Sequence, residues 1–330
     1  MGERTVPKIP FSISVYEHAA RLIGRSPWEV SRDPELLYQA HRAAYLLYRH
    51  FPVVVGIDIY TLEAEASGCV VKRPEGNGIP AVTRPRFGSL DDALAWGTAG
   101  RAPTPVTAGR IPAFIAAGRR LAAEFPEADV RLPVSGPFSI ATSLLGLEEL
   151  LVGVAERPEA VGALLRRLIP GQVAFCQAVR EAGLEVAFFE SAAAPPLLSP
   201  RQFREVELPA LQETMQGVAE IVGHSVPCII GGDTEPIIDA MLETGTDFVI
   251  CPAETNRERF LARMERYPHV KVRVNLNPAL YTRGTREEII TEVDRVIALA
   301  GGKPNVLLGT GAVPYETPPE NLLLIRDYVA

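Results

Sequence analysis

This sequence of 330 residues has few cysteines, no long apolar run and no excess of basic residues. Its four cysteines stand far apart without a C-x-x-C pair, which excludes a zinc knuckle and the cysteine framework of a small secreted protein. No uninterrupted run of 18 apolar residues occurs, and the first residues lack the apolar core of a signal peptide. Acidic residues outnumber basic ones by 40 to 33, a net charge of −7, so nucleic acid is not an expected partner. We expect a soluble, cytoplasmic protein that binds a small molecule.

Common catalytic signatures are also missing. The sequence has no G-x-S-x-G elbow, P-loop or H-E-x-x-H motif, and no G-x-G-x-x-G follows the first strand-like run. The last absence disfavours an open, doubly wound sheet with a dinucleotide site. What the sequence does have is an alternation of short apolar runs with amphipathic stretches.

The apolar runs are nearly continuous, which is typical of strands buried on both faces of a parallel sheet. They lie at residues 53–60, 130–137, 186–191, 226–233, 247–253, 270–278 and 306–312. Each is followed by a helical pattern or a long connection, so we predict an α/β fold, a single TIM (β/α)8 barrel with one strand that the pattern does not locate. We expect one domain over residues 1–330, with an N-terminal helical extension at 1–50 and an excursion over the barrel mouth at 69–105.

Active sites of such barrels lie at the carboxyl ends of the strands. This rule, together with the helical segment after the first run, selects four candidate catalytic carboxylates: Asp58, Glu63, Glu65 and Glu190. Candidate substrate-binding residues lie near the same strand ends: Tyr60, Ser135, Phe138, Ser191, Asp233, Asn275, Asn277 and Thr310. Asp58 and Glu190 each follow a strongly apolar run, so burial should shift their pKa values or bring them a partner, as is common at functional sites.

Several of these residues also have a structural interpretation. Asp233 precedes a helical pattern and could cap it, and Asn275 and Asn277 could form turns. Cys251 ends a strand and could be either a thiolate metal ligand or a buried free cysteine.

Five segments, in chain order, resemble blocks of one known family. VSGPFSIATSLLG (134–146) is similar to its G-P-[FW]-[ST]-x-A block, and ESAAAPPLLSPRQF (190–203) to its acidic residue followed by L-[ST]-P-x-x-F. The other three segments are EPIIDAMLETGTDFV (235–249), VNLNPALYTRGTREEI (274–289) and YETPPENLLLI (315–325). The ordered set resembles the uroporphyrinogen decarboxylase superfamily. That resemblance implies a TIM barrel and, in the decarboxylases, a homodimer.

The superfamily has two main chemistries. Its decarboxylases clamp the carboxylates of a porphyrinogen with the arginines of an R-Q-A-G-R segment, where this sequence has VYEHAARLIGRSPWEVSRDPELL. Asp58 fits the position of their catalytic aspartate within one residue. Without those arginines, acids at the barrel mouth would repel a substrate with eight carboxylates. The N-terminal stretch and the T-P-P-E-N ending look more like the second branch, methyltransferases that act with methylated substrates, corrinoid proteins and thiols.

Thiol-activating members of that branch bind zinc through an H-x-C-G segment and a late cysteine. This sequence has CIIGGDT (228–234) and Ala312 at those places, so the usual zinc motif is absent. A zinc ion needs about three protein ligands with one position open, and the local candidates are Glu190, Cys228 and Cys251.

The resemblance therefore implies a methyltransferase-like enzyme that moves a methyl group between a small methylated substrate or thiol and a corrinoid protein. In that mechanism Asp58, Glu63 or Glu65, and Glu190 position the methyl donor or protonate its leaving group. One alternative is a decarboxylase-type lyase that acts on a tetrapyrrole or a smaller carboxylic acid. Another is a barrel that binds a tetrapyrrole or corrinoid without turnover.

Overall fold

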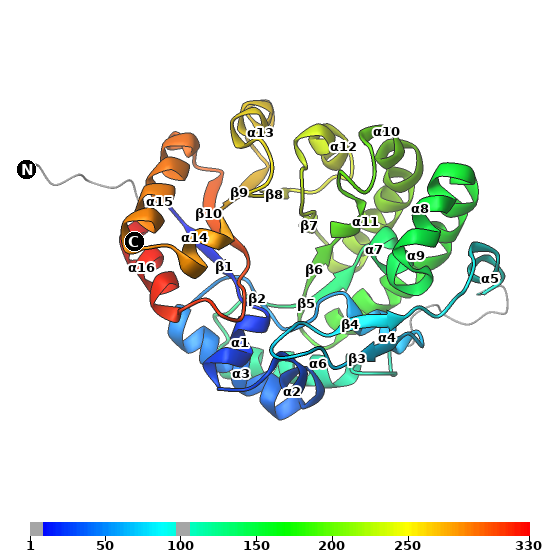
Figure 1. Ribbon diagram of the computed structural model, residues 1–330, viewed down its shortest axis with the longest axis horizontal. Coiled ribbons are helices and arrows are strands. Elements are labelled where there is room, and N and C mark those ends of the chain that lie inside the picture. The colour runs from blue at the N-terminus through cyan, green and yellow to red at the C-terminus, as the bar shows by residue number, and fades with distance from the viewer. Residues whose placement is uncertain (1–8, 97–105) are drawn as a thin grey trace, which may run out of the picture.

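The computed structural model describes residues 9–96 and 106–330, and the centre of this part of the chain is made of parallel strands (Figure 1). The strands form two four-stranded sheets, with the orders β1-β10-β9-β8 and β2-β5-β6-β7, and every pairing within them is parallel. Their bounds are β1 (Phe11–Ser14), β2 (Val53–Val54), β5 (Val130–Ser135), β6 (Glu185–Phe189), β7 (Cys228–Ile229), β8 (Phe248–Cys251), β9 (Lys271–Asn275) and β10 (Val306–Ala312). The predicted α/β fold with a parallel sheet is therefore confirmed.

The strand that the sequence pattern did not locate is β1. It pairs in parallel with the last strand, β10, in a register that aligns Phe11 with Leu308. Its sequence, Phe-Ser-Ile-Ser, alternates apolar and polar residues over only four positions, so it lacks the continuous apolar run of the other strands. Since it begins the chain order of strands and lies beside the last one, the order around the two sheets is that of a (β/α)8 barrel.

The two sheets meet at two seams, where β1 faces β2 and β7 faces β8. Among residues 9–96 and 106–330, no strand pairing crosses either seam. Side chains cross instead: Ser12 Oγ donates to the Phe51 carbonyl at 2.7 Å, and Thr246 Oγ1 accepts the Cys228 N–H at 3.1 Å. The predicted barrel is thus seen as eight described strands in barrel order, without continuous ladder hydrogen bonds around the circle.

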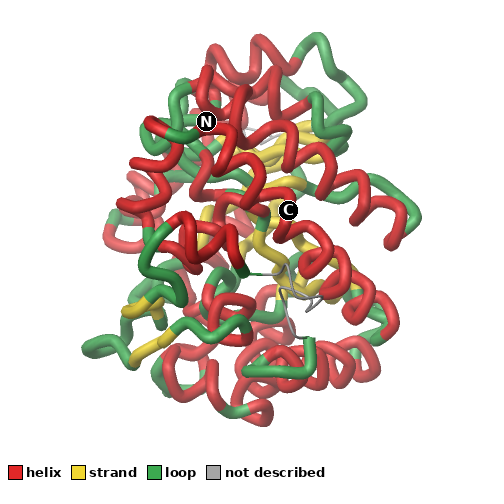
Figure 2. Tube along the Cα trace, turned by 90° about the vertical axis from the view of Figure 1, so that its right-hand side faces the viewer, coloured by secondary structure: helices red, strands yellow, loops and turns green. Residues whose placement is uncertain are grey.

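Helices lie outside the strands (Figure 2). Those before β6 are α1 (Glu17–Leu22), α2 (Pro27–Arg32), α3 (Pro34–Tyr48), α4 (Thr61–Ala66), α5 (Leu90–Ala95), α6 (Ile111–Glu124), α7 (Pro137–Leu145), α8 (Leu147–Glu156) and α9 (Pro158–Glu181). Those after β6 are η1 (Ser191–Ala193), α10 (Pro200–Gln202), η2 (Phe203–Glu207), α11 (Leu208–Val222), η3 (Glu235–Ile237), α12 (Ile238–Leu242), α13 (Arg257–Met264), α14 (Pro278–Arg283), α15 (Arg286–Ala300) and α16 (Pro319–Val329). No single helix among the described residues is long and apolar enough to cross a membrane.

Local sequence signals explain where several helices begin. Asp33 accepts two backbone N–H groups at the start of α3, and Thr285 with Glu288 forms a capping box at the start of α15. These helices bury an apolar face against the strands, because their buried residues recur at three- and four-residue spacing.

The predicted excursion at 69–105 contains an antiparallel pair of short strands, β3 (Val70–Lys72) and β4 (Ala81–Arg84), followed by α5. Its residues 97–105 lie outside the described residues, as do residues 1–8 of the predicted N-terminal extension. Between β3 and β4, Ile79 and Pro80 line a cavity at the carboxyl ends of β1 and β2. Figure 1 shows β3 and β4 beside α4, close to the start of α1.

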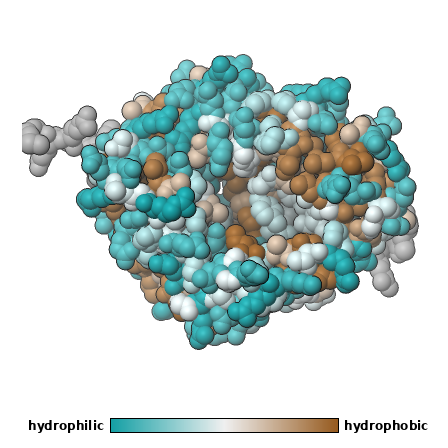
Figure 3. Space-filling view, viewed as in Figure 1, coloured by the Kyte–Doolittle hydropathy of each residue, from teal (hydrophilic) through white to brown (hydrophobic). Residues whose placement is uncertain are grey.

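Two separate apolar clusters form the core. The larger lies between the strands and the surrounding helices, and the smaller lies inside the ring of strands around Tyr16, Val54, Ala187 and Phe189. Several other inward positions carry small residues, such as Ser12 and Gly309, so the interior is not filled by bulky side chains in the way that barrel interiors usually are. Viewed as in Figure 1, the surface is hollowed near its centre, with hydrophobic residues on part of the wall (Figure 3).

Candidate active site at the carboxyl ends of the strands

A cavity of about 150 Å3 lies where β1, β2 and β10 end. The residues that line it include Tyr16, Glu17, Asp58, Tyr60 and Thr61, together with Ile79 and Pro80, and nearly all of its lining surface is apolar. Of the predicted site residues, Asp58 and Tyr60 reach this cavity. Tyr16 and Glu17 were not predicted because they follow β1, the strand that the sequence pattern did not locate.

Three aromatic rings stand together beside the cavity. Tyr16 and Tyr60 each contact Phe189 edge to face, with ring centroids 6.2 and 6.3 Å apart and interplanar angles of 80° and 82°. The Tyr60 hydroxyl donates to Ser191 Oγ at 2.5 Å. Burial raises the pKa of Tyr60, so its hydroxyl stays protonated and acts as a donor. The predicted residues Tyr60 and Ser191 therefore contact each other at the strand ends.

Glu17, in the first turn of α1, is the cavity-lining carboxyl group without a cation beside it. It is 7% exposed, and no ion pair within the described part of the chain involves it. Burial raises the pKa of Glu17 to about 7, its own backbone N–H acts to lower it, and the nearby carboxylate of Glu316 raises it further. Near neutral pH this side chain is therefore present in both protonation states, as a proton donor or acceptor should be.

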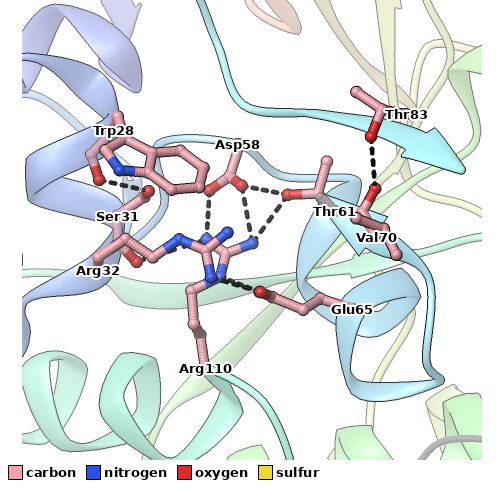
Figure 4. Close-up of polar contacts among 9 residues, drawn as sticks. All are labelled: Trp28, Ser31, Arg32, Asp58, Thr61, Glu65, Val70, Thr83 and Arg110. Carbon is pink, nitrogen blue, oxygen red and sulfur yellow. Dashed lines mark hydrogen bonds and ion pairs between the residues drawn. The ribbon is translucent and has the colours of Figure 1, made fainter. Parts of the chain in front are cut away.

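Asp58 is instead held by a buried arginine (Figure 4). Arg110 Nη1 donates to Asp58 Oδ1 and Nη2 to Oδ2, both at 2.8 Å, and the hydroxyl of Thr61 also donates to Oδ2. The side chain of Asp58 is fully buried and that of Arg110 is 7% exposed. Both Asp58 oxygens are thus occupied by a bidentate, charge-assisted pair, which fixes the position of the carboxylate.

Glu65 belongs to the same network. Arg110 Nε donates to Glu65 Oε2 at 2.5 Å, and Arg32 of α2 donates to the other oxygen. Although burial acts to raise the pKa of Glu65, hydrogen bonds from Arg32 and Arg110 lower it overall. Figure 4 shows the two arginines between Asp58 and Glu65. In this arrangement Asp58 and Glu65 hold the cavity wall in place instead of exchanging protons.

Three other carboxyl groups lie deeper, behind the strand ends. Glu63 Oε2 accepts the Ser135 N–H at 2.7 Å, and Glu190 Oε1 accepts both the N–H and the hydroxyl of Ser139 at 2.8 Å. Among the residues that the structure describes, Glu63 Oε1, Glu190 Oε2 and both oxygens of Glu207 have no hydrogen-bond partner. Burial raises the pKa of Glu63 to about 7 and that of Glu190 to about 8, and burial with the nearby Glu190 raises the pKa of Glu207. At neutral pH Glu190 and Glu207 are therefore mostly protonated, whereas Glu63 is present in both protonation states.

Glu190 is connected to the cavity through hydrogen bonds. Ser139 Oγ, which donates to Glu190, also accepts the Ala192 N–H at 3.2 Å. This contact fixes η1, the turn that carries Ser191 and therefore the hydroxyl partner of Tyr60. Glu190 thus acts on the cavity as a positioning residue, through Ser139 and Ser191.

The candidate metal ligands do not come together. Burial raises the pKa of both predicted thiols, well above its usual value for Cys228, which lies near Glu190, and to about 12 for Cys251, which lies near Arg257. Within residues 9–96 and 106–330, no group of three or more His, Cys, Asp or Glu side chains is arranged to hold a metal ion. Zinc bound by Glu190, Cys228 and Cys251 stays a prediction that these positions do not support, and no step below uses a metal.

The other predicted substrate-binding residues have structural partners. Asn277 caps α14 by accepting the Ala279 N–H at 3.0 Å, and Thr310 accepts the Ser14 N–H at 2.9 Å. Phe138 is fully buried in the larger apolar cluster. The remaining ones are Ser135, whose N–H donates to Glu63, Asp233, which accepts from Thr255 at 2.8 Å, and Asn275, which accepts from Arg273 at 3.1 Å. None of these six lines the 150 Å3 cavity.

Comparison with known proteins places this architecture. A family model described as uroporphyrinogen decarboxylase (URO-D) matches residues 1–330. No curated protein matches the sequence. Among solved structures, a methyltransferase from Methanosarcina mazei superposes with a TM-score of 0.81 at 21% identity, over 97% of this chain and 94% of that one. Xylanase B from Clostridium stercorarium F9 superposes with a TM-score of 0.38 at 10% identity, over 66% of this chain and 74% of that one. The family and the first of these structures imply a TIM barrel.

Proposed function

This chain belongs to the uroporphyrinogen decarboxylase family, and we propose that within this family it is a methyltransferase-like enzyme. It transfers the methyl group of a small methoxylated substrate to a corrinoid carried by a partner protein. The resemblance of the N-terminal stretch and of the T-P-P-E-N ending to the methyltransferase branch supports this choice of chemistry.

The observation that carries the proposal is the position of Glu17 at the cavity, together with its raised pKa. A methoxyl group is a poor methyl donor because its oxygen leaves as an alkoxide or phenoxide unless a proton is supplied. Glu17 lines the cavity, has no cation beside it, and has a pKa of about 7, raised by burial. It therefore retains a proton at neutral pH and can give it to an oxygen atom in the cavity.

The size of the cavity supports a small donor. Its volume of about 150 Å3 is below the range of roughly 300–1,000 Å3 that is common for sites of drug-sized ligands. The rings of Tyr16 and Tyr60 and the side chains of Ile79 and Pro80 enclose it with apolar surface. A tetrapyrrole is much larger than this space, which disfavours both the porphyrinogen lyase and the tetrapyrrole-binding alternative.

The arginines near the cavity also disfavour a porphyrinogen. The sequence predicts acids at the barrel mouth, and two of them are paired with arginines of the protein itself. Asp58 is paired with Arg110, which precedes α6, and Glu65 is paired with Arg110 and with Arg32 of α2. These arginines are already satisfied by the protein's own carboxylates, so they are not free to clamp the carboxylates of a substrate.

Methyl transfer requires cleavage of the methyl–oxygen bond of the donor and a proton for the oxygen that leaves. The bond between the methyl carbon and the donor oxygen breaks, and its electron pair stays on the oxygen. Glu17 gives its proton to that oxygen, so the products are a neutral alcohol or phenol and a carboxylate at Glu17. A corrinoid carried by the partner protein would supply the electron pair for the new bond to the methyl group. Asp58 with Arg110 holds the cavity wall, and Glu190 orients Tyr60 through Ser139 and Ser191.

The test is methyl transfer to cob(I)alamin, which is followed by absorbance. The methyl donors are methoxyacetate and 2-methoxyphenol, and their demethylated counterparts serve as blanks. We expect transfer by the wild type and a loss of at least about a hundredfold in Glu17→Gln, the usual size of a general-acid contribution. Glu148→Gln removes an exposed carboxylate of α8 that does not line the cavity, and it should keep the activity. Carbon dioxide release from uroporphyrinogen, or no transfer from any donor, contradicts the proposal.

A further inference from the structure

A second, larger cavity of about 590 Å3 opens at the opposite end of the strands. Its rim is made of residues that immediately precede strands, among them Pro10 before β1, Pro52 before β2, Asp129 before β5 and Pro227 before β7. This end is the amino end of the parallel strands, away from Glu17. The volume lies within the range of roughly 300–1,000 Å3 for sites of small organic ligands.

Arg273 of β9 projects from the strand wall into this interior. Its path requires Gly309 of β10, because a Cβ at that position would stand 2.4 Å from Arg273 Cδ and 2.6 Å from Cγ. A contact below 3.0 Å between a Cβ and the stem of another side chain does not occur without displacement. The pairing of a glycine with an arginine across two strands therefore makes room for this guanidinium.

The guanidinium of Arg273 is buried without a carboxylate. The residue is 5% exposed, Nε donates to Asn275 Oδ1 at 3.1 Å, and no other hydrogen bond or ion pair involves it in the described part of the chain. Its electrostatic neighbours are the hydroxyls of Tyr16 and Tyr281, which are neutral, and burial lowers its pKa. A buried charge that is not paired is costly, so such a group calls for an anion from outside the chain.

The charges of the cavity lining that have no partner of opposite charge are positive, like that of Arg273. Asp129 is the carboxylate of the lining, and it pairs with Arg131 at 2.6 Å. Lys271, at the rim, is exposed, and together with Arg273 it leaves two cations that no lining carboxylate balances. The walls between these cations are apolar, with Phe51, Ile229 and Phe248 among them.

We propose that this cavity binds an organic anion, with its carboxylate or phosphate against Arg273 and its apolar body along the walls at the amino ends of the strands. The cavity opens at the amino ends of the strands, whereas its inner end, at Arg273, lies near Asn275 and Tyr16. The proposal does not rest on methyl transfer. Guanidinium groups bind both kinds of anion through paired N–H donors, and the walls require a hydrocarbon portion.

The experiment uses 8-anilino-1-naphthalenesulfonate, an aromatic anion that fluoresces in apolar sites, displaced by octanoate, octyl phosphate or octan-1-ol. We expect octanoate, octyl phosphate or both to displace the dye from the wild type at a concentration at least about tenfold below that of octan-1-ol. In Arg273→Met this preference should disappear, since one charge-assisted contact is worth about tenfold or more. Arg167→Met, which removes an exposed arginine of α9 far from the lining, should behave as wild type.

Two further measurements separate binding from folding. Octanoate should raise the melting temperature of the wild type more than octan-1-ol does, because a ligand that binds the folded state stabilises it. Arg273→Met itself should melt at the wild-type temperature or above, since it removes an unpaired buried charge. Lys271→Met, at the exposed rim, should weaken octanoate binding several-fold without affecting folding. Equal displacement by octanoate and octan-1-ol in the wild type, or an unchanged preference in Arg273→Met, overturns the proposal.

Discussion

Removing Arg110 tests the network that holds the cavity wall. In Arg110→Met, Asp58 keeps the hydroxyl of Thr61 but loses the bidentate contact, and its side chain is fully buried. Breaking a buried ion pair from one side costs about 3–5 kcal/mol, because the remaining charge is left without compensation. With roughly 2–4 °C per kcal/mol for a chain somewhat smaller than this one, the melting temperature should fall by about 6–20 °C.

Two comparison variants isolate this cause. Asp58→Asn leaves Arg110 paired with Glu65, so the loss should be smaller, and the double variant Asp58→Asn with Arg110→Met should be more stable than Arg110→Met alone. Arg42→Met breaks the more exposed pair with Glu124, whose contribution should be about 1 kcal/mol or less.

The assay is thermal unfolding followed by circular dichroism at one protein concentration. If Arg110→Met melts within 2 °C of Arg42→Met, or if the two single losses simply add in the double variant, the pair is not what stabilises this region, and the reasoning is refuted.

Three further outcomes follow from the buried acids and thiols. Burial raises the pKa of Glu190 from 4.5 to about 8, so the folded chain binds this proton more tightly than the unfolded chain does. The resulting stabilisation is complete below about pH 4.5 and is lost as the pH rises towards 8. The urea concentration at the unfolding midpoint should therefore decrease as the pH is raised from about 5 to about 9, and it should decrease less steeply in Glu190→Gln. Gly136→Ala should lower the free energy of unfolding by about 1–3 kcal/mol, because its Cβ would stand 1.7 Å from Glu190 Oε2, whereas Gly162→Ala, in open space on α9, should be neutral or stabilising in the same urea titration. All four cysteines are buried, so 5,5′-dithiobis(2-nitrobenzoate) should react with them only as fast as the protein opens, and rapid reaction of any thiol in the folded protein would contradict this placement.

The sequence predicted the architecture better than the site. Apolar runs identified the parallel strands β2 and β5 to β10, and most of these runs are nearly continuous because the strands are buried on both faces; β9 is the one with regular polar alternation. It missed β1, whose two serines point into the ring of strands and interrupt the apolar run. Because site residues were sought at strand ends, missing this strand also meant missing Tyr16 and Glu17. Placing the eighth strand at residues 11–14 would have found both.

Ion pairing could not be predicted in the same way. Asp58 and Arg110 are 52 positions apart, and their contact depends on how α6 begins beside the end of β2. Burial was predicted to bring Asp58 and Glu190 a partner or to shift their pKa values. Asp58 has a partner, Arg110, and the pKa of Glu190 is raised.

For Arg273 a signal did exist. Lys271, Arg273 and Asn275 alternate along β9, which places three polar side chains on one face of a strand whose other face is apolar.

The pH dependence of the first turnover of methyl transfer to cob(I)alamin tests the central claim most directly. Burial and the nearby carboxylate of Glu316 raise the pKa of Glu17 to about 7. Asp58, the other carboxylate of the cavity, is already paired with Arg110, and Tyr16 and Tyr281 near Glu17 are uncharged. The account predicts a rate that falls above about pH 7 in the wild type, a fall that begins at lower pH in Glu316→Gln, and a slow, pH-independent rate in Glu17→Gln. A Glu17→Gln variant with the wild-type rate and the same fall above pH 7 would contradict it.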